Sequence, residues 1–294
     1  MSLNRPIWKL RDWIDVKKLR INLLSLNENA IQYLEENPDK IVWYYLSANP
    51  NAIHILEKNP EKIDWNYLSC NENAMKILEY NTEKINWYNI SENPNAIKVL
   101  EQNMERINWL YISLNPNAIH IIEKNLEKIN WKQLSLNPNA IHLLEKNPEM
   151  IDWSKLSRNK NAIHLIEKNP EKIDWYNLSL NENAINLLEK NPEKIFWSNL
   201  SYNINSIDLL KANPEKINWA ILSRNKNAIE LLKKNQDKID WYNICHNSSI
   251  FELDYEKMRI NNQEMYEELI KEVMKPSRVF KNPDYDYLEE LFGD

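Results

Sequence analysis

Tryptophan recurs every 22 residues through most of the chain, and no other sequence feature constrains the fold as strongly. Self-similarity at a fixed period indicates a solenoid, in which each unit buries its apolar face against its neighbours. Ile21 occupies the same place one period before the first of these tryptophans. We therefore expect tandem repeats over residues 21–253, a basic N-terminal cap at 1–20, and a C-terminal helical cap with an acidic tail at 254–294. The recurring tryptophans are Trp43, Trp65, Trp87, Trp109, Trp131, Trp153, Trp175, Trp197, Trp219 and Trp241.

The consensus unit, counted from the tryptophan as position 1, is W-x-x-L-S-x-N-x-N-A-I-x-h-L-E-K-N-P-E-K-I-[D/N]. A leucine-rich repeat would fit positions 1, 4, 9 and 11. It would also bury position 6, where this chain has Glu92 and Arg158. Two short helices per unit fit better. In the second helix, at 100° per residue, positions 10, 11, 13 and 14 form one apolar stripe. The first helix, which begins at the tryptophan, then has a fixed face at positions 1, 4 and 5 and a variable face at positions 2, 3 and 6. We predict an all-α fold, an elongated α-solenoid of about ten helical-hairpin repeats and on the order of 100 Å long. A leucine-rich-repeat-like solenoid is the alternative.

Asparagine and proline mark where the helices begin and end. Asn49 followed by Pro50 predicts the start of a helix over residues 50–58, and Asn59 before Pro60 predicts its end. Aspartate or asparagine at position 22, such as Asp64, is expected to cap the helix that starts at the next tryptophan. Since the chain has one glycine, we expect asparagine to take left-handed turn conformations. The asparagines at positions 7, 9 and 17 should form caps and an inter-unit ladder, and the serine at position 5 should bond local backbone groups.

Composition excludes several functional classes. With a single glycine the chain cannot build a phosphate-binding glycine loop or a nucleophile elbow. Cys70 and Cys245 are too far apart in sequence to suggest a disulfide framework or a zinc motif, which favours a reducing, cytoplasmic compartment. His120, His142 and His164 share position 12, but units about 10 Å apart cannot bring them to one zinc ion at about 2 Å. We expect no metal, no cofactor, no signal peptide and no membrane span.

The regularity of the repeats argues against an enzyme, because catalytic sites usually break local regularity. A tryptophan that becomes fully buried removes roughly 150–250 Å² from water, so we expect the tryptophan ladder to be structural core.

Two units, WYYLSANPNAIHILEKNPEKID at 43–64 and WKQLSLNPNAIHLLEKNPEMID at 131–152, carry a resemblance. Tandem units of this kind resemble a family of repeat proteins encoded by giant DNA viruses of the mimivirus type. The resemblance covers residues 21–253 and implies a location in the infected host cytoplasm or in the virion. It implies no activity, cofactor or site residue.

The variable face is the candidate binding surface, because tyrosine and arginine are enriched at interaction hot spots. We expect a non-enzymatic protein-binding scaffold or adaptor, whose partner is another protein or a second copy of the chain. A structural or virion component that assembles through its ends is the alternative. Nucleic-acid binding is less favoured, because the net charge is −6 and the pI about 5.6. The acidic segment at 282–294 is a further candidate. The candidate partner-binding residues are Tyr44, Tyr45, Tyr67, Tyr88, Leu110, Tyr111, Leu114, Lys132, Lys155 and Arg158.

Overall fold

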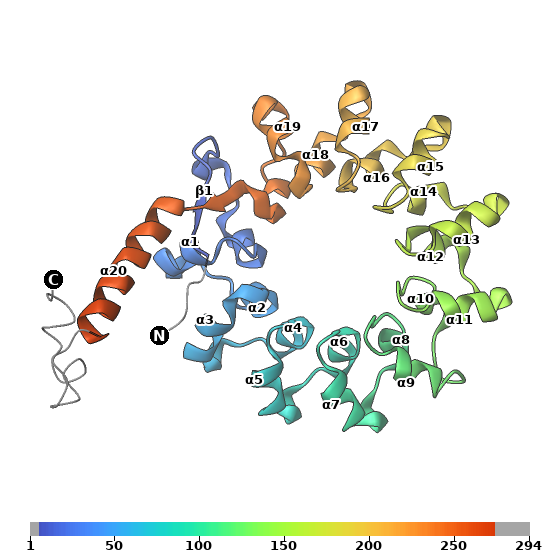
Figure 1. Cartoon of the computed structure of the whole chain (residues 1–294), viewed down its shortest axis with the longest axis horizontal. Coiled ribbons are helices and arrows are strands. Elements are labelled where there is room, and N and C mark those ends of the chain that lie inside the picture. The colour runs from blue at the N-terminus through green and yellow to red at the C-terminus, as the bar shows by residue number, and fades with distance from the viewer. Residues whose placement is uncertain (1–5, 274–294) are drawn as a thin grey trace, which may run out of the picture. The chain divides into compact units, whose positions relative to one another are not determined.

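A computed structural model describes residues 6–273 and confirms an all-α solenoid of short, regularly repeating helices (Figure 1). The described residues divide into two compact units. One is Leu10–Phe251, and the other contains residues 6–9 and 252–273. The only strands in this part of the chain are β1 (Trp8–Leu10) and β2 (Phe251–Leu253), which pair with each other.

Most repeats contain three short helical segments, of which the first begins at or near the tryptophan position. In the first and last repeats this segment is a 3₁₀ helix, at Ile21–Leu26 and Asn243–His246. In the others it is α2 (Trp43–Ala48), α4 (Trp65–Cys70), α6 (Trp87–Glu92), α8 (Trp109–Ile112), α10 (Trp131–Leu134), α12 (Trp153–Arg158), α14 (Trp175–Leu178), α16 (Trp197–Tyr202) and α18 (Trp219–Leu222).

The second segment begins at position 11, and a third, 3₁₀ segment follows it in most repeats. The second segments are α1 (Ile31–Glu36), α3 (Ile53–Lys58), α5 (Met75–Glu79), α7 (Ile97–Glu101), α9 (Ile119–Glu123), α11 (Ile141–Lys146), α13 (Ile163–Lys168), α15 (Ile185–Glu189), α17 (Ile207–Ala212) and α19 (Ile229–Lys234). The third segments are Pro38–Lys40, Pro60–Lys62, Thr82–Lys84, Met104–Arg106, Pro148–Met150, Pro170–Lys172, Pro192–Lys194, Pro214–Lys216 and Gln236–Lys238.

The capping side chains act as the sequence predicts. The Asp64 carboxylate accepts hydrogen bonds from the backbone N–H groups of Asn66 and Tyr67 at the start of α4. The Asn49 side chain accepts one from the N–H of Asn51. The helix expected over residues 50–58 consists of a 3₁₀ turn, Pro50–Ala52, followed by α3.

The expected left-handed asparagine does not occur at the position before proline. Asn59 has φ −135° and ψ 57°, and the equivalent asparagines have nearly the same values. The Asn59 side chain holds this turn by donating to the carbonyl oxygen of Ile55 at 2.8 Å. Because φ stays negative, the turn needs no glycine, which explains how the chain manages with only one.

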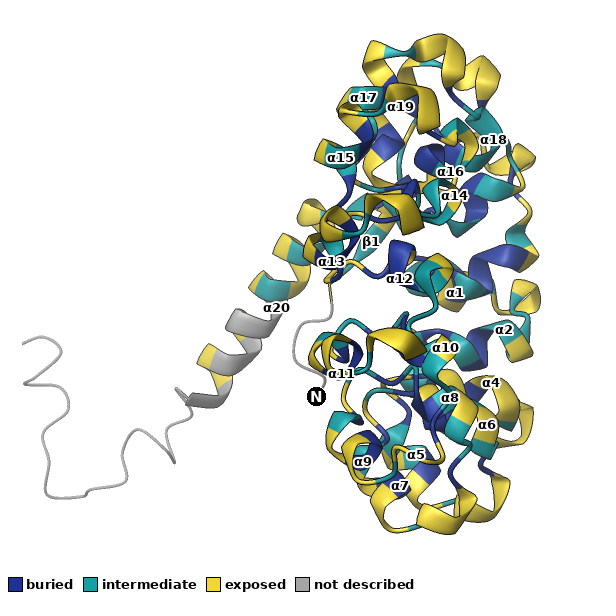
Figure 2. Ribbon diagram, turned by 90° about the vertical axis from the view of Figure 1, so that its right-hand side faces the viewer, coloured by how far each residue is buried: buried dark blue, intermediate teal, exposed yellow. Residues whose placement is uncertain are grey.

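The core runs through the middle of each repeat and is made of small and medium apolar side chains. Leu46, Ala52 and Leu56, at positions 4, 10 and 14, are completely buried, and their counterparts are buried in nearly every repeat. Figure 2 shows the resulting mixture of buried and exposed residues along the helices. The tryptophans differ from the expectation of full burial, since each is only half-buried. In most repeats a cation covers the exposed ring face, as the Lys62 ammonium does at 4.5 Å from the Trp43 ring centroid.

Buried asparagines at position 7 join each repeat to the one before it. Asn137 is 1% exposed, and its Nδ2 donates to the carbonyl oxygens of Ser113 at 3.0 Å and Asn115 at 2.9 Å. Asn139, at position 9, donates to the carbonyl oxygen of Pro116. The Ser135 hydroxyl, at position 5, bonds within its own repeat and joins the Trp131 carbonyl to the N–H of Asp152. The predicted ladder is therefore present at positions 7 and 9, whereas the asparagine at position 17 bonds only within its own repeat.

This ladder of hydrogen bonds closes on itself. Asn27, in the first repeat, donates to the carbonyl oxygens of Cys245 at 3.0 Å and Asn247 at 3.1 Å, in the last. Asn29 donates in the same way to Ser248. These are the bonds that Asn49 and Asn51 make to the repeat before them. The first and last repeats are thus packed as neighbours, and residues 10–251 form the ring that Figure 1 shows.

The repeat that begins at Trp241 is completed by residues from the N-terminal end. The N–H of Arg20 donates to Cys245 Sγ at 3.3 Å, as the N–H of Asp64 does to the hydroxyl of Ser47 within one repeat. Lys18 lies 5.1 Å from the Trp241 ring centroid, in the place that a lysine of the same repeat takes elsewhere. The 3₁₀ helix Val16–Lys18 corresponds to Pro60–Lys62.

Residues 10–251 therefore differ from the elongated array of about ten repeats that we expected. They form a closed array of eleven, in which residues 15–20 complete the last repeat. Closure removes the two open ends that an N-terminal cap and a C-terminal cap would have to cover.

In the other unit, α20 (Tyr255–Val273) is the longer helix expected in the C-terminal region. The Asp254 carboxylate accepts a hydrogen bond from the N–H of Lys257 in its first turn. Lys9 of β1 and Glu252 of β2 form an ion pair at 4.0 Å. The acidic segment at 282–294 lies outside the described residues.

Candidate interaction surface

The helices that begin at tryptophan form the inner rim of the ring of residues 10–251, and the second helices form its outer rim (Figure 1). Positions 4 and 5 of the inner helices are buried, whereas position 2 is exposed in nearly every repeat. The division into a fixed packed face and a variable accessible face, expected from the helical wheel, is therefore present.

The five tyrosines of the candidate surface form two clusters. The first cluster is Tyr44 and Tyr45 on α2 with Tyr67 on α4. The ring centroids of Tyr44 and Tyr45 are 4.2 Å apart, and the Tyr67 centroid lies 5.6 Å from that of Tyr44 and 6.4 Å from that of Tyr45. Tyr88 and Tyr111, on α6 and α8, meet edge to face at 6.1 Å. We call these five residues the tyrosine surface.

The tyrosine surface keeps much of its area accessible. Tyr44, Tyr67 and Tyr88 are 43%, 41% and 61% exposed. A hydrogen bond with the Tyr45 hydroxyl raises the pKa of Tyr44, so the Tyr44 hydroxyl is neutral at physiological pH. Leu110, between the tyrosines of α6 and α8 in sequence, is 40% exposed. The tyrosine surface is thus an uncharged aromatic area.

A pocket of about 410 Å³ lies where α4, α6 and α8 are neighbours. Cys70, Glu92 and Leu114, all at position 6, contribute to its lining. Glu92 and Cys70 are exposed, but partial desolvation in this pocket raises the pKa of Glu92, and partial desolvation together with the Glu92 charge raises the pKa of the Cys70 thiol. The Cys70 thiol is therefore a poor nucleophile. Leu114, a candidate partner-binding residue, lines this pocket and is not among the tyrosine rings.

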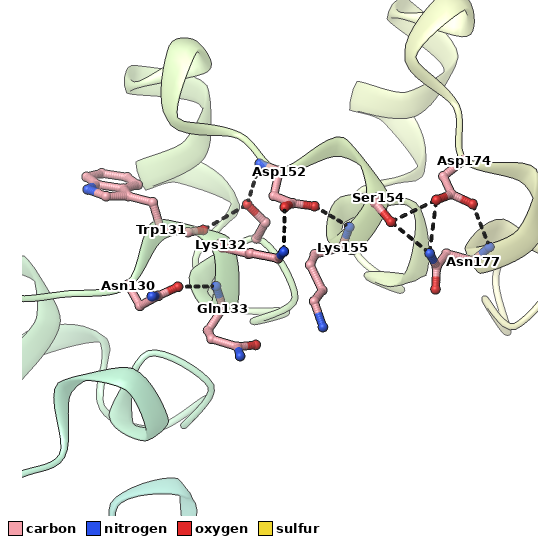
Figure 3. Close-up of polar contacts among 10 residues, drawn as sticks. Asn130, Trp131, Lys132, Gln133, Asp152, Ser154, Lys155, Asp174 and Asn177 are labelled. Carbon is pink, nitrogen blue, oxygen red and sulfur yellow. Dashed lines mark hydrogen bonds and ion pairs between the residues drawn. The ribbon is translucent and has the colours of Figure 1, made fainter.

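The basic candidates are not gathered with the tyrosines. The Lys132 ammonium is 3.9 Å from the Asp152 carboxylate, which also accepts a hydrogen bond from the N–H of Lys155 (Figure 3). Arg158 is exposed and lines a different pocket, together with Tyr202. The tyrosines thus lie on α2 to α8, and the three basic candidates follow on α10 and α12, where Lys132 is already paired with an acidic side chain.

On α12 and α14, the small polar side chains of Ser154 and Asn177 occupy positions of the variable face. The Ser154 hydroxyl donates to the Asp174 carboxylate at 2.7 Å, and the Asn177 amide donates to both (Figure 3). Burial alone would raise the pKa of Asp174, but hydrogen bonds from the Asn177 backbone, the Ser154 hydroxyl and the Asn177 amide lower it. Because these polar groups already form hydrogen bonds with one another, they have less capacity left to bind a partner than the tyrosine surface has.

One exposed aromatic pair is not among the candidate residues predicted from the sequence. Tyr176 and Phe196 are 54% and 48% exposed and lie 5.4 Å apart. Phe196 occupies position 22, where we expected an aspartate or asparagine cap. The missing cap residue is the signal that could have identified it.

The histidines at position 12 each pair with a glutamate of the preceding repeat. His120 lies 2.9 Å from Glu101, and His142 lies 2.8 Å from Glu123. Among residues 6–273, no group of three or more histidine, cysteine or carboxylate side chains could hold a metal ion.

No protein-family model, curated protein or solved structure matches this chain. None of the helices in the described part of the chain is long and apolar enough to cross a membrane.

Proposed function

We propose that this chain is a non-enzymatic protein-binding scaffold and that its partner, or a second copy of the chain, docks on the tyrosine surface. The observation that carries the proposal is the clustering of five tyrosines on α2, α4, α6 and α8, of which Tyr44, Tyr67 and Tyr88 are exposed. Tyrosine supplies a large, rigid contact area at low cost in side-chain entropy.

The alternatives have less support. Assembly through the ends needs free inter-unit bonding groups, but Asn27 already donates to Cys245 and Asn247. Nucleic-acid binding needs clustered cations, whereas the tyrosine surface is uncharged and the chain is acidic overall. We also propose, from the sequence resemblance, a giant-virus origin and a place in the infected cytoplasm or the virion.

The test is a triple substitution, Tyr67→Ser, Tyr88→Ser and Tyr111→Ser, compared with the native chain. Proteins that the native chain retains from infected host cells are quantified on each variant, and self-association is measured by sedimentation velocity. We expect normal folding, with retention or self-association reduced roughly tenfold, about 1.4 kcal/mol.

The matched control is Tyr80→Ser, Tyr242→Ser and Tyr255→Ser, which removes three exposed tyrosines elsewhere. The control should bind like the native chain. Equal binding by the first triple variant, or equal loss in the control, would reject the tyrosine surface as the docking site.

A further inference from the structure

A second surface lies along positions 6 and 8 of the repeats that begin at Trp153, Trp175 and Trp197. A pocket of about 240 Å³ crosses these repeats, and side chains from consecutive repeats line it. We call it the 6/8 groove. Its lining includes Arg158, Lys160, Leu180, Glu182, Tyr202 and Ile204.

The middle of the 6/8 groove is largely apolar. Leu180 and Ile204 are half-buried, and Tyr202 is 47% exposed. Glu182 is the one carboxylate among the residues that line the pocket. An aliphatic and aromatic floor of this kind favours apolar side chains over phosphates, which Glu182 would repel.

Basic pairs flank Leu180, Glu182, Tyr202 and Ile204 in the order of the repeats: one pair lines the pocket, and the other lies one repeat beyond its lining. Arg158 and Lys160 occupy positions 6 and 8 of one repeat, and Arg224 and Lys226 occupy the same positions three repeats later. All four residues are exposed. Within residues 6–273, none of their side chains forms an ion pair or a hydrogen bond. Other basic residues do have partners: Lys98 pairs with Glu79, and Lys62 covers the ring of Trp43. These four charges are therefore available to an external anion.

The spacing defines the length of the occupant. Three repeats at about 10 Å each separate the basic pairs by roughly 30 Å. An extended peptide covers about 3.3 Å per residue, so about nine residues span this distance. We propose that the 6/8 groove binds an extended protein segment of about nine residues, acidic at both ends and apolar in the middle. The proposal does not depend on the tyrosine surface, which lies at positions 2 and 3 of other repeats.

The test measures binding of fluorescein-labelled nine-residue peptides to the full chain by fluorescence anisotropy. The peptides carry Asp-Glu at both ends and varied Leu, Ile and Tyr residues between them. We expect binding by the native chain and a loss of at least tenfold in the variant with Arg158→Gln, Lys160→Gln, Arg224→Gln and Lys226→Gln. Peptides with serine in the middle should also bind at least tenfold more weakly.

The matched control changes the same amount of charge at the C-terminal ends of the outer helices, with Lys58→Gln, Lys146→Gln, Lys168→Gln and Lys190→Gln. It should change affinity less than twofold. The proposal is overturned if no peptide binds the native chain, or if the control loses as much affinity as the groove variant. It is also overturned if a ten-nucleotide oligothymidine binds as tightly as the best peptide and depends on the same four residues.

Discussion

The asparagine at position 7 offers the sharpest test of how the repeats are held together. In Asn137→Ala the side chain loses two inter-repeat donor bonds, to Ser113 at 3.0 Å and Asn115 at 2.9 Å, and the bond it accepts from the N–H of Asn139 at 3.0 Å. Asn137 is 1% exposed, so water cannot replace these partners.

The magnitude follows from those three bonds. A typical intramolecular hydrogen bond contributes about 0.5–1.5 kcal/mol, and an unsatisfied buried group costs about 1–3 kcal/mol. We expect Asn137→Ala to lower the free energy of unfolding by about 3 kcal/mol, measured by urea denaturation followed by circular dichroism.

Asn139→Ala is the matched control. It also removes one asparagine bond between repeats, to Pro116 at 2.8 Å, but from an exposed side chain that water can replace. Its cost should stay under about 1 kcal/mol. The reasoning is refuted if Asn137→Ala costs no more than Asn139→Ala.

Three further predictions concern single positions. Cys245→Ser restores the consensus hydroxyl beside the N–H of Arg20, and thermal denaturation should give a variant at least as stable as the native chain, by up to about 1 kcal/mol. Trp131→Ala removes a half-buried ring and should lower the free energy of unfolding, measured by urea denaturation, by about 2–3 kcal/mol, which is below the range for fully buried rings. An unchanged urea midpoint would show that packing of this ring does not stabilise the fold. Asp174→Asn should cost less than about 1 kcal/mol at pH 7. Since the folded pKa of Asp174 is lowered, the stability that its carboxylate contributes is present above about pH 3.9 and is lost as the pH falls through the folded pKa. A stability difference between the native chain and Asp174→Asn that persists at lower pH would contradict this explanation.

The helices were predictable because the determining signals are local and repeated eleven times. Capping by Asp64 and Asn49 and burial of Leu46 follow from side-chain chemistry within one repeat. The half-burial of the tryptophans was not predictable from size alone. In most repeats a cation 19 residues away, such as Lys62 over Trp43, lies over the ring face, and a helical wheel does not reveal a contact between such distant positions.

Ring closure could not be predicted from the repeat pattern, because it depends on the curvature that accumulates over eleven repeats. One signal was present: residues 15–20 end in a lysine, an apolar residue and a polar residue, as Lys62, Ile63 and Asp64 do. Without a tryptophan or an asparagine–proline pair, this segment resembles a basic cap. For the candidate surface, the wheel placed the tyrosines on the accessible side but could not reveal that Lys132 pairs with Asp152.

The most direct test of the structure is the separation of the first and last repeats in solution. Nitroxide labels are attached after Asn22→Cys and Tyr242→Cys, both exposed and both at position 2, in a chain that also carries Cys70→Ser. The control pair, Leu110→Cys and Lys132→Cys, occupies position 2 of two consecutive repeats. Closure predicts the same dipolar broadening of the continuous-wave spectrum for both pairs, since each would be about one helix diameter apart, roughly 10 Å. Broadening in the control pair but none between residues 22 and 242 would contradict closure and indicate an open array.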